Sequence, residues 1–147
     1  MPRQPRSQLP NGIFHVTARA VADKPLYVDD YDRKRFLWLL KRFCSEFGLQ
    51  RHAYCLLGTH YHLLLEGRSA DLSRLMHRVN SRYAQQYNER HAGYGHLFGE
   101  RYTVRVVQDE KQLADTYAYI EANPREAGLC GWDEPWPWAW TDLIAAA

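Results

Sequence analysis

Cysteine is scarce in this sequence of 147 residues, and the three thiols, Cys44, Cys55 and Cys130, lie far apart. Scattered thiols fit neither a disulfide framework nor a zinc ribbon, so we interpret them as reduced, small hydrophobic residues of a cytoplasmic protein. Long apolar runs are also lacking: no stretch reaches the roughly 18 apolar residues of a membrane span. The first residues contain no apolar segment of a secretion signal. We therefore expect neither secretion nor a membrane partner.

Repeats, low-complexity segments and linkers long enough to separate domains are absent as well. We predict a single domain over residues 1–147, with a flexible basic arm at 1–10 and a C-terminal tail at 131–147. The net charge of +2 is small but unevenly spread, because residues 1–20 carry three arginines and no acid, whereas the tail carries three acids and no base. This distribution suits a polyanionic partner, although ordinary solvated surfaces explain it equally well.

Hydrophobic periodicity predicts strands and helices in the order β-α-β-β-α-β-α. Such a doubled split β-α-β unit forms a ferredoxin-like antiparallel sheet. We therefore predict an α+β fold with helices on one face, the other face open to a ligand, and an additional C-terminal helix. The predicted elements are strand 13–19, a helix from Asp29 or Asp30 to Gly48, strand 50–56, a strand from residue 60, helix 69–91, strand 103–107 and helix 109–123, which ends before Pro124.

A His-x-His pair, His60 and His62, stands within an apolar run. Successive side chains of a β-strand point to opposite faces, so both imidazoles lie on one face and can share a metal ion. The alternative is that they are ordinary half-buried strand residues with hydrogen bonds of their own. Strand 13–19 also has a polar, basic face, which carries His15, Thr17 and Arg19.

The last predicted helix carries Tyr119 and Asn123. Leu113, Tyr117 and Ile120 form its apolar stripe, and Tyr119 is displaced from that stripe. Asn123 follows four residues later, so both side chains lie on one flank and can face one point on an adjacent sheet. The spacing alone favours the simpler interpretation, a surface tyrosine and a residue at the end of a helix.

Several segments of the chain, taken in order, resemble a known family. Together they span nearly the whole sequence, and they are 14–19, 53–57, 60–65, 95–102 and 119–129. The combination is similar to the REP-associated tyrosine transposases and their insertion-sequence relatives, the single-tyrosine members of the HUH nuclease superfamily. The resemblance implies a ferredoxin-like domain in which His60 and His62 bind a divalent metal ion and the additional C-terminal helix carries the nucleophile, Tyr119. Asn123 matches a polar residue that often completes the metal site.

Two positions qualify this assignment. Tyr117 is a rival nucleophile, but its place on the apolar stripe predicts burial. Relatives usually carry Asn or Glu just before the first histidine, where this chain has Thr59. Since that position is not a metal ligand, we expect a change in the surroundings of the ligands and not in the ligand set.

The resemblance implies a metal-dependent single-stranded DNA endonuclease and strand transferase that cleaves at or near hairpin DNA. Tyr119 attacks the phosphate, forms a covalent 5′-phosphotyrosine and frees a 3′-hydroxyl, after which the covalent ester allows a second strand to be joined. Neutral ligands leave a metal ion its full charge for the phosphate oxygens. The family implies Mg²⁺, and two imidazoles with an amide predict that Mn²⁺ also binds. The sequence indicates no general base.

The expected partner is single-stranded or hairpin DNA, contacted through phosphates and stacked bases. We expect the tryptophans of the tail to fold onto the core and not to stack on bases. Both a homodimer and a monomer stay open. The predicted DNA-binding residues are Arg3, Arg6, His15, Arg19, Arg101 and Tyr102, with Arg74, Arg78 and Arg82 as further candidates.

Two other functions are compatible with the same residues. One is a domesticated, non-cleaving nucleic-acid-binding protein, for which the departure at Thr59 gives some basis. The other is a zinc-type hydrolase that uses water and forms no covalent intermediate, which would leave Tyr119 without a role. A covalent adduct between protein and DNA distinguishes the transposase from both.

Overall fold

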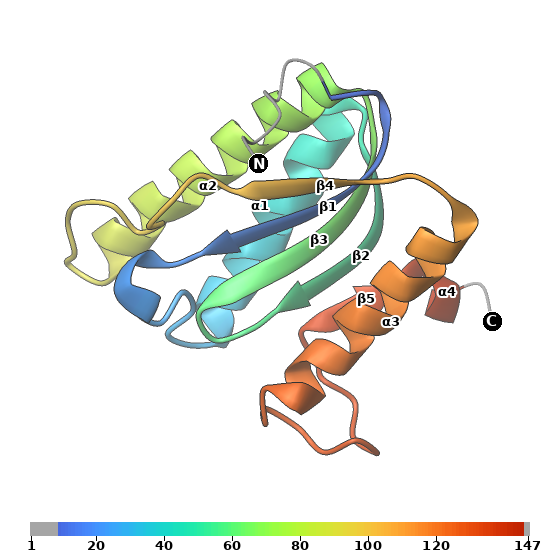
Figure 1. The fold of residues 1–147 in the computed structure, drawn as a ribbon. Helices are drawn as coiled ribbons and strands as arrows, with labels where there is room; N and C mark the ends of the chain where they lie inside the picture. Colours follow the sequence, from blue (N-terminus) through green and yellow to red (C-terminus); the bar gives the residue numbers. More distant parts are fainter. Residues whose placement is uncertain (1–8, 146–147) are drawn as a thin grey trace.

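The chain folds around a five-stranded antiparallel sheet (Figure 1). The structure is a computed structural model and describes residues 9–145, so Arg3 and Arg6 lie outside the described residues. The strand order is β4-β1-β3-β2-β5. The strands are β1 (Gly12–Arg19), β2 (Gln50–Leu56), β3 (His60–Gly67), β4 (Thr103–Val107) and β5 (Ala139–Thr141), and the helices are η2 (Val21–Asp23), α1 (Asp30–Phe47), α2 (Ser69–Arg90), α3 (Glu110–Glu126) and α4 (Asp142–Ala145).

Helices α1 and α2 cover one face of the sheet and enclose the main core (Figure 1). Alternation along the strands explains this, since Phe14 and Val16 of β1 and Leu63 and Leu65 of β3 all point to this face and are fully buried. The buried residues of α2 recur at helical spacing, and they are Leu72, Leu75, Met76, Val79, Tyr83 and Tyr87. Removing these apolar surfaces from water is the dominant favourable term that holds the two layers together.

Side-chain caps determine where α1 and α3 begin. Asp29 accepts a hydrogen bond from the backbone N–H of Asp32 at 3.1 Å, and Asp109 accepts one from the backbone N–H of Gln112 at 2.8 Å. Each aspartate thereby pairs a donor that has no acceptor within its helix. Helix α1 ends at Gly48, whose φ of 75° lies in the left-handed region that glycine adopts without strain.

Helix α3 lies on the opposite face of the sheet, where it forms a second and smaller core (Figure 1). The helix contributes Tyr117 and Ile120, which pack with the buried residues Ala53, Cys55 and Leu64 of the sheet. Because this second core has few members, the position of α3 depends on a small number of contacts. This helix carries the tyrosine of interest.

The prediction that α3 ends before Pro124 is wrong, because the helix continues through Pro124 for two more residues. Proline has no N–H and therefore cannot bond to the carbonyl one turn earlier. The carbonyl of Ile120 therefore loses its helical donor, while the two neighbouring carbonyls accept additional side-chain hydrogen bonds. The amide of Asn123 donates to the carbonyl of Tyr119 at 3.1 Å, and the guanidinium of Arg125 donates to the carbonyl of Glu121 at 2.7 Å.

The C-terminal tail adds the strand β5, which periodicity did not predict. It pairs with β2 at the edge of the sheet, and Trp140 stacks on Tyr54 with ring centroids 5.9 Å apart. The indole of Trp136 donates a hydrogen bond to the carbonyl of Leu56 at 2.9 Å. The prediction that the tail folds onto the core is therefore confirmed for Trp136, Trp138 and Trp140, whereas Trp132 is exposed.

The predicted α+β fold and the predicted order of its elements are confirmed. The split β-α-β units form the sheet, and the additional helix carries Tyr119, as expected. Within residues 9–145, no helix is long and apolar enough to cross a membrane. Cys44 and Cys55 are buried free thiols, which agrees with their interpretation as small hydrophobic residues.

Candidate active site

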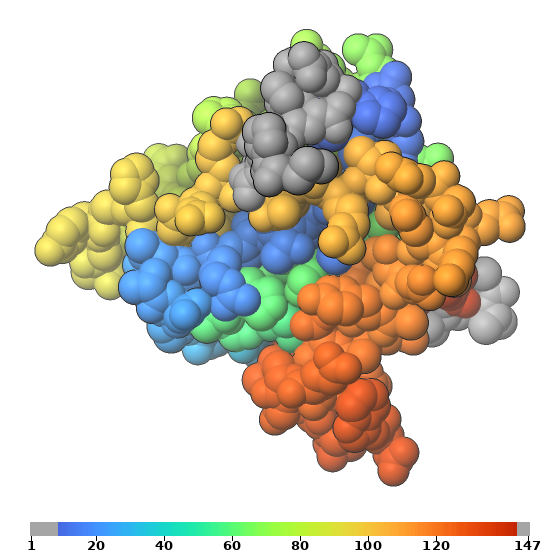
Figure 2. Space-filling model, viewed as in Figure 1, coloured from blue at the N-terminus to red at the C-terminus, as the bar shows by residue number. Residues whose placement is uncertain are grey.

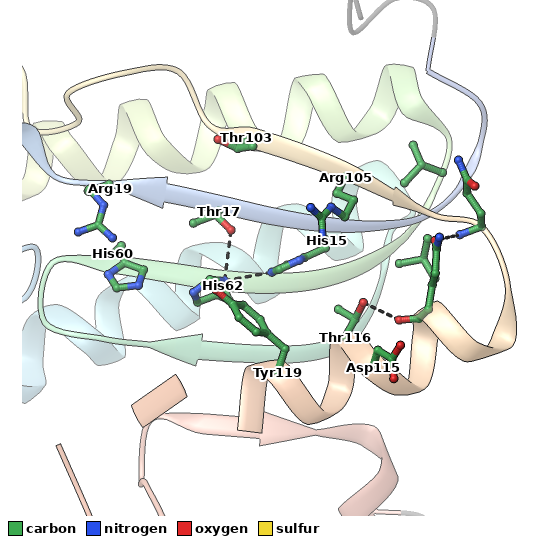
Figure 3. A pocket seen from close by; sticks show the side chains of 14 residues that line it. His15, Thr17, Arg19, His60, His62, Thr103, Arg105, Asp115, Thr116 and Tyr119 are labelled. Atoms are coloured by element: carbon green, nitrogen blue, oxygen red, sulfur yellow. Dashed lines mark hydrogen bonds between the residues drawn. The ribbon is translucent and has the colours of Figure 1, made fainter. Parts of the chain in front are cut away.

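An open cleft with a volume of about 900 Å³ lies between α3 and the face of the sheet that α1 and α2 leave free. In Figure 2 the surface of β1 and β3 is visible between β4 and α3. Strands β1, β3 and β4 form the floor and one wall, and α3 forms the other wall (Figure 3). The cleft is lined by His15, Thr17, Arg19, His60, His62, Thr103, Arg105, Val106, Val107, Gln108, Gln112, Asp115, Thr116 and Tyr119.

Strand alternation brings the polar residues of β1 and β3 to the same floor. His15, Thr17 and Arg19 occupy every second position of β1, and His60 and His62 do so on β3. The antiparallel register pairs Thr17 with His62 and Arg19 with His60. Both histidines of the pair therefore lie on one face, as the alternation predicted, and the polar face of β1 lies beside them.

His62 is the most enclosed side chain of this group, with 4% of its surface exposed. Its Nδ1 lies 3.0 Å from Nε2 of His15 and 3.2 Å from Oγ1 of Thr17. The rings of His15 and His62 are stacked with centroids 5.2 Å apart. Its other nitrogen, Nε2, is buried and has no hydrogen-bond partner among the described residues. A buried polar atom without a partner is costly, and it is frequent where a ligand or ion binds.

The electrostatic surroundings keep all three imidazoles neutral at pH 7. Burial, followed by the charge of Arg105, lowers the pKa of His15 to about 4. Burial and the neighbouring imidazoles lower the pKa of His62 to about 3. Burial, followed by the charge of Arg19, lowers the pKa of His60 to about 4. A neutral imidazole has one nitrogen lone pair free to bind a metal ion.

Tyr119 reaches this floor from α3. Its ring meets His62 edge-on with centroids 5.5 Å apart, and it meets His15 with centroids 5.9 Å apart. In Figure 3 the side chain extends from the helix towards the imidazoles. The residue is 51% exposed, so a substrate in the cleft has access to the phenol.

Tyr117, the rival nucleophile, is buried as predicted and does not line the cleft. Its hydroxyl donates a hydrogen bond to Oδ1 of Asp142 at 2.6 Å. Burial, reinforced by this bond and by the charge of the carboxylate, raises the pKa of Tyr117. The phenol of Tyr117 is therefore harder to ionise and is engaged elsewhere, which leaves Tyr119 as the accessible tyrosine of α3.

The same carboxylate belongs to a network that holds α3 against the sheet. His52 lies at an irregularity of β2, where the register with β3 shifts. Its Nδ1 is 2.6 Å from Asp142 and its Nε2 is 2.7 Å from Glu66, so both ring nitrogens face carboxylates. Burial alone would lower the pKa of His52, but the two carboxylates outweigh it and raise the pKa. We call Glu66, His52, Asp142 and Tyr117 the latch.

His60 has a network of its own at the end of the floor. Oγ1 of Thr59 lies 3.2 Å from Nδ1 of His60. The guanidinium of Arg19 donates to the same Thr59 oxygen at 3.3 Å and forms an ion pair with Asp23 at 3.0 Å. Arg19, predicted to contact DNA, is therefore also bound within the protein.

Asn123 is not among the residues that line the cleft. Its amide nitrogen donates to the carbonyl of Tyr119 within α3, and a role as a ligand stays a prediction. Among the described residues, no group of three or more His, Cys, Asp and Glu side chains is arranged to hold a metal ion. A cation at the histidine pair would therefore need further donors such as an amide, water or the substrate.

The other predicted DNA contacts lie apart from this cleft. Arg101 and Tyr102 line a second cavity of about 490 Å³ between α2 and the loop that follows it. The arginines of α2 belong to a helix on the opposite face of the sheet (Figure 1). The structure thus brings His15 and Arg19 together with Tyr119 and places Arg74, Arg78, Arg82, Arg101 and Tyr102 elsewhere.

Several cleft residues were missed as functional candidates in the sequence. Thr17 belongs to the polar face of β1, and Arg105 shares the corresponding face of β4 with Thr103. Asp115 precedes Tyr119 by one helical turn and lines the same cleft. Strand and helix periodicity predicts the face on which each of these residues lies. Only the packing of β4 and α3 around the histidines distinguishes them from other surface residues.

The fold and the cleft together define a ferredoxin-like α+β domain that presents a histidine pair and a tyrosine on the open face of its sheet. Comparison with known proteins agrees with this description. The chain belongs to the family of IS200-like transposases, whose sequence pattern matches residues 9–123. The resemblance to REP-associated tyrosine transposases and their insertion-sequence relatives is thereby confirmed.

Individual relatives support the same assignment. A candidate REP-associated tyrosine transposase of Haemophilus influenzae is 26% identical over 139 residues, which cover 87% of this chain and 78% of that protein. A REP-associated tyrosine transposase solved in complex with a REP hairpin has a TM-score of 0.80 at 17% identity, covering 99% of this chain and 86% of that one. A candidate transposase of Deinococcus radiodurans has a TM-score of 0.54 at 20% identity, covering 82% of this chain and 96% of that one.

Proposed function

We propose that this protein cleaves and rejoins single-stranded DNA at or near a hairpin through a covalent bond to Tyr119. The observation that carries the proposal is the position of the Tyr119 ring, which lies edge-on to His62 in an open cleft. Membership of a transposase family supports DNA as the substrate. A solved transposase of the same fold, bound to a REP hairpin, supports a hairpin as the recognised feature.

The residues of the cleft fit a divalent cation. Nε2 of His62 is buried without a partner among residues 9–145, and the lowered pKa values of His60 and His62 keep both rings neutral. His60 and His62 would hold the ion, with Asn123 as a further donor once its amide turns away from its own helix. A bound cation would offset negative charge on the scissile phosphate. Imidazole donors favour Mn²⁺, whereas the family implies Mg²⁺.

Tyr119 supplies the nucleophile of the covalent step. The oxygen of Tyr119 attacks phosphorus and forms a new P–O bond, while the bond to the 3′-oxygen breaks. The phenol loses its proton, and the departing 3′-oxygen gains one. Because one phosphodiester replaces another, little energy is lost, and a second 3′-hydroxyl can reverse the step and join a different strand.

Charge in the cleft suits a single strand of DNA. Arg105 of β4 and Arg19 of β1 present guanidinium groups on either side of the histidines (Figure 3). Guanidinium groups bind phosphates with paired hydrogen bonds. Asp115 is the one acidic residue among the lining residues. The cleft therefore attracts a polyanion.

A covalent adduct is the decisive measurement. Labelled hairpin oligonucleotides with randomised single-stranded flanks are incubated with the protein and Mn²⁺, and the products are separated under denaturing conditions. Wild-type protein should carry label, and Tyr119→Phe should not. Tyr94→Phe is the matched control, since Tyr94 is 93% exposed and lies outside the cleft.

Each other result identifies a different function. Cleavage without a labelled protein band would support a hydrolase that uses water. Binding without cleavage by the wild-type protein would support a domesticated nucleic-acid-binding protein. An adduct that still forms with Tyr119→Phe would show that another residue is the nucleophile.

A further inference from the structure

Each imidazole of the histidine pair has a threonine hydroxyl beside the same ring nitrogen. Oγ1 of Thr17 lies 3.2 Å from Nδ1 of His62, and Oγ1 of Thr59 lies 3.2 Å from Nδ1 of His60. The two threonines come from different segments, β1 and the turn between β2 and β3. Because both threonine oxygens lie beside Nδ1, Nε2 of each ring is left for another partner.

Both hydroxyls are themselves held in place. Thr17 pairs with His62 in the register of β1 and β3, so the backbone sets its distance from the ring. Thr59 accepts a hydrogen bond from Arg19 at 3.3 Å, and Asp23 in turn fixes Arg19. These constraints make the two hydroxyls part of a preformed arrangement.

A neutral imidazole carries one proton, and its location decides which nitrogen can bind a cation. A proton on Nε2 of His62 would be a buried N–H donor, and the described residues offer it no acceptor. A proton on Nδ1 has the Thr17 oxygen as an acceptor at 3.2 Å, and Nε2 of His15, at 3.0 Å, is a second acceptor when His15 carries its own proton on Nδ1. The geometry therefore favours the Nδ1–H form, because a buried donor without an acceptor is unfavourable.

We propose that Thr17 and Thr59 are positioning residues that hold His62 and His60 in the Nδ1–H form and direct both Nε2 atoms towards one cation. His15 assists at His62 as a second acceptor. The inference rests on the proposed function for the identity of the ligand, but the tautomers themselves are a property of the protein alone. It also gives Thr59 a role, because its hydroxyl would accept a hydrogen bond from Nδ1–H of His60.

The test separates the tautomers from catalysis. Long-range ¹H–¹⁵N correlation spectra of the metal-free protein at pH 7.5 assign the protonated nitrogen of each ring. Wild-type His60 and His62 should both be Nδ1–H. Thr17→Val keeps the shape of the side chain but leaves Nε2 of His15 as the remaining acceptor, so the fraction of His62 in the Nδ1–H form should fall, whereas Thr17→Ser should restore the wild-type spectrum. Thr59→Val should act in the same way on His60 alone.

Metal affinity gives a second readout, with Mn²⁺ as the probe. Loss of an outer hydrogen bond to a ligating histidine typically weakens metal binding about 10- to 100-fold. Thr17→Val and Thr59→Val should each weaken Mn²⁺ binding by about tenfold or more. Thr141→Val is the matched control, because Thr141 lies in β5 outside the cleft and its buried hydroxyl has no hydrogen-bond partner among the described residues. Its Mn²⁺ affinity should match that of wild type.

Two results would overturn the inference. One is an Nε2–H ring at His60 or His62 in the wild-type protein. The other is unchanged tautomers and unchanged Mn²⁺ affinity in both valine variants. Wild-type protein that binds no Mn²⁺ would instead refute the metal dependence in the proposed function, and the spectra would still decide the role of the threonines. Thermal unfolding of each variant verifies that it is folded.

Discussion

The ring of Tyr119 lies edge-on to the ring of His62, with centroids 5.5 Å apart, although the two residues belong to elements on different sides of the cleft. The sheet fixes the position of His62, whereas the position of Tyr119 depends on how α3 packs against the sheet. Anything that moves α3 therefore changes the distance between the proposed nucleophile and the proposed metal site.

Truncation of Ile120 should loosen α3 selectively. Ile120 is 1% exposed and belongs to the small core under this helix. Ile120→Ala should lower the free energy of unfolding by about 2–5 kcal/mol. Hydrogen exchange should show that the amides of α3 lose more protection than those of β3. Leu75→Ala, in the main core, should destabilise the protein without this preference for α3. Equal loss of protection in both elements would contradict the prediction.

The latch should make stability depend on pH. Because the pKa of His52 is raised in the folded state, protonated His52 stabilises the fold. This stabilisation is complete below the ordinary pKa of 6.5 and is lost as the pH rises through the folded-state pKa. Asp142 has a lowered pKa, because hydrogen bonds from Tyr117 and His52 outweigh the effect of burial. Its contribution is present above 3.8 and is lost as pH falls through the folded-state value. Urea unfolding from pH 6 to 9 should show a falling difference in stability between wild type and His52→Asn. A constant difference would exclude the latch as the cause.

Binding of a cation should tolerate mild acid. The pKa values of about 4 for His60 and about 3 for His62 mean that protons compete for the rings only in strongly acidic solution. Mn²⁺ affinity should therefore change little between pH 7.5 and pH 5.5, as measured by titration calorimetry. A tenfold loss over this range would indicate imidazoles with ordinary pKa values. The same lowered values predict that His15, His60 and His62 reduce stability as pH falls below 6.5, because the folded state resists their protonation.

The tail should stabilise the sheet through one indole. Trp136→Phe removes the hydrogen bond to the Leu56 carbonyl and should lower the free energy of unfolding by about 1 kcal/mol in urea titrations. Trp132→Phe provides the comparison, since Trp132 is 66% exposed, and it should change stability by less than about 0.5 kcal/mol. Equal effects of the two substitutions would argue that the tail contributes by packing alone.

Local patterns in the sequence were sufficient for most of the fold. Alternation and helical spacing depend on neighbouring residues, so they located β2 and β4 at their observed bounds and placed both histidines on one face. They failed at Pro124, through which the helix continues, and side chains of Asn123 and Arg125 add hydrogen bonds to the carbonyls on either side of the one that proline leaves without a donor. They also failed at β5, because a strand of three residues has too short a pattern to detect.

The sequence by itself determined the elements, the shared face of His60 and His62, and the displacement of Tyr119 from the apolar stripe of its helix, since each follows from the periodicity of a strand or a helix. Only the tertiary structure decided which side chains meet. The register of β1 and β3 placed Thr17 beside His62, and the seating of α3 brought Tyr119 to the same floor while the latch engaged Tyr117. Contacts between distant segments depend on tertiary packing, so the spacing of residues within one segment cannot predict them.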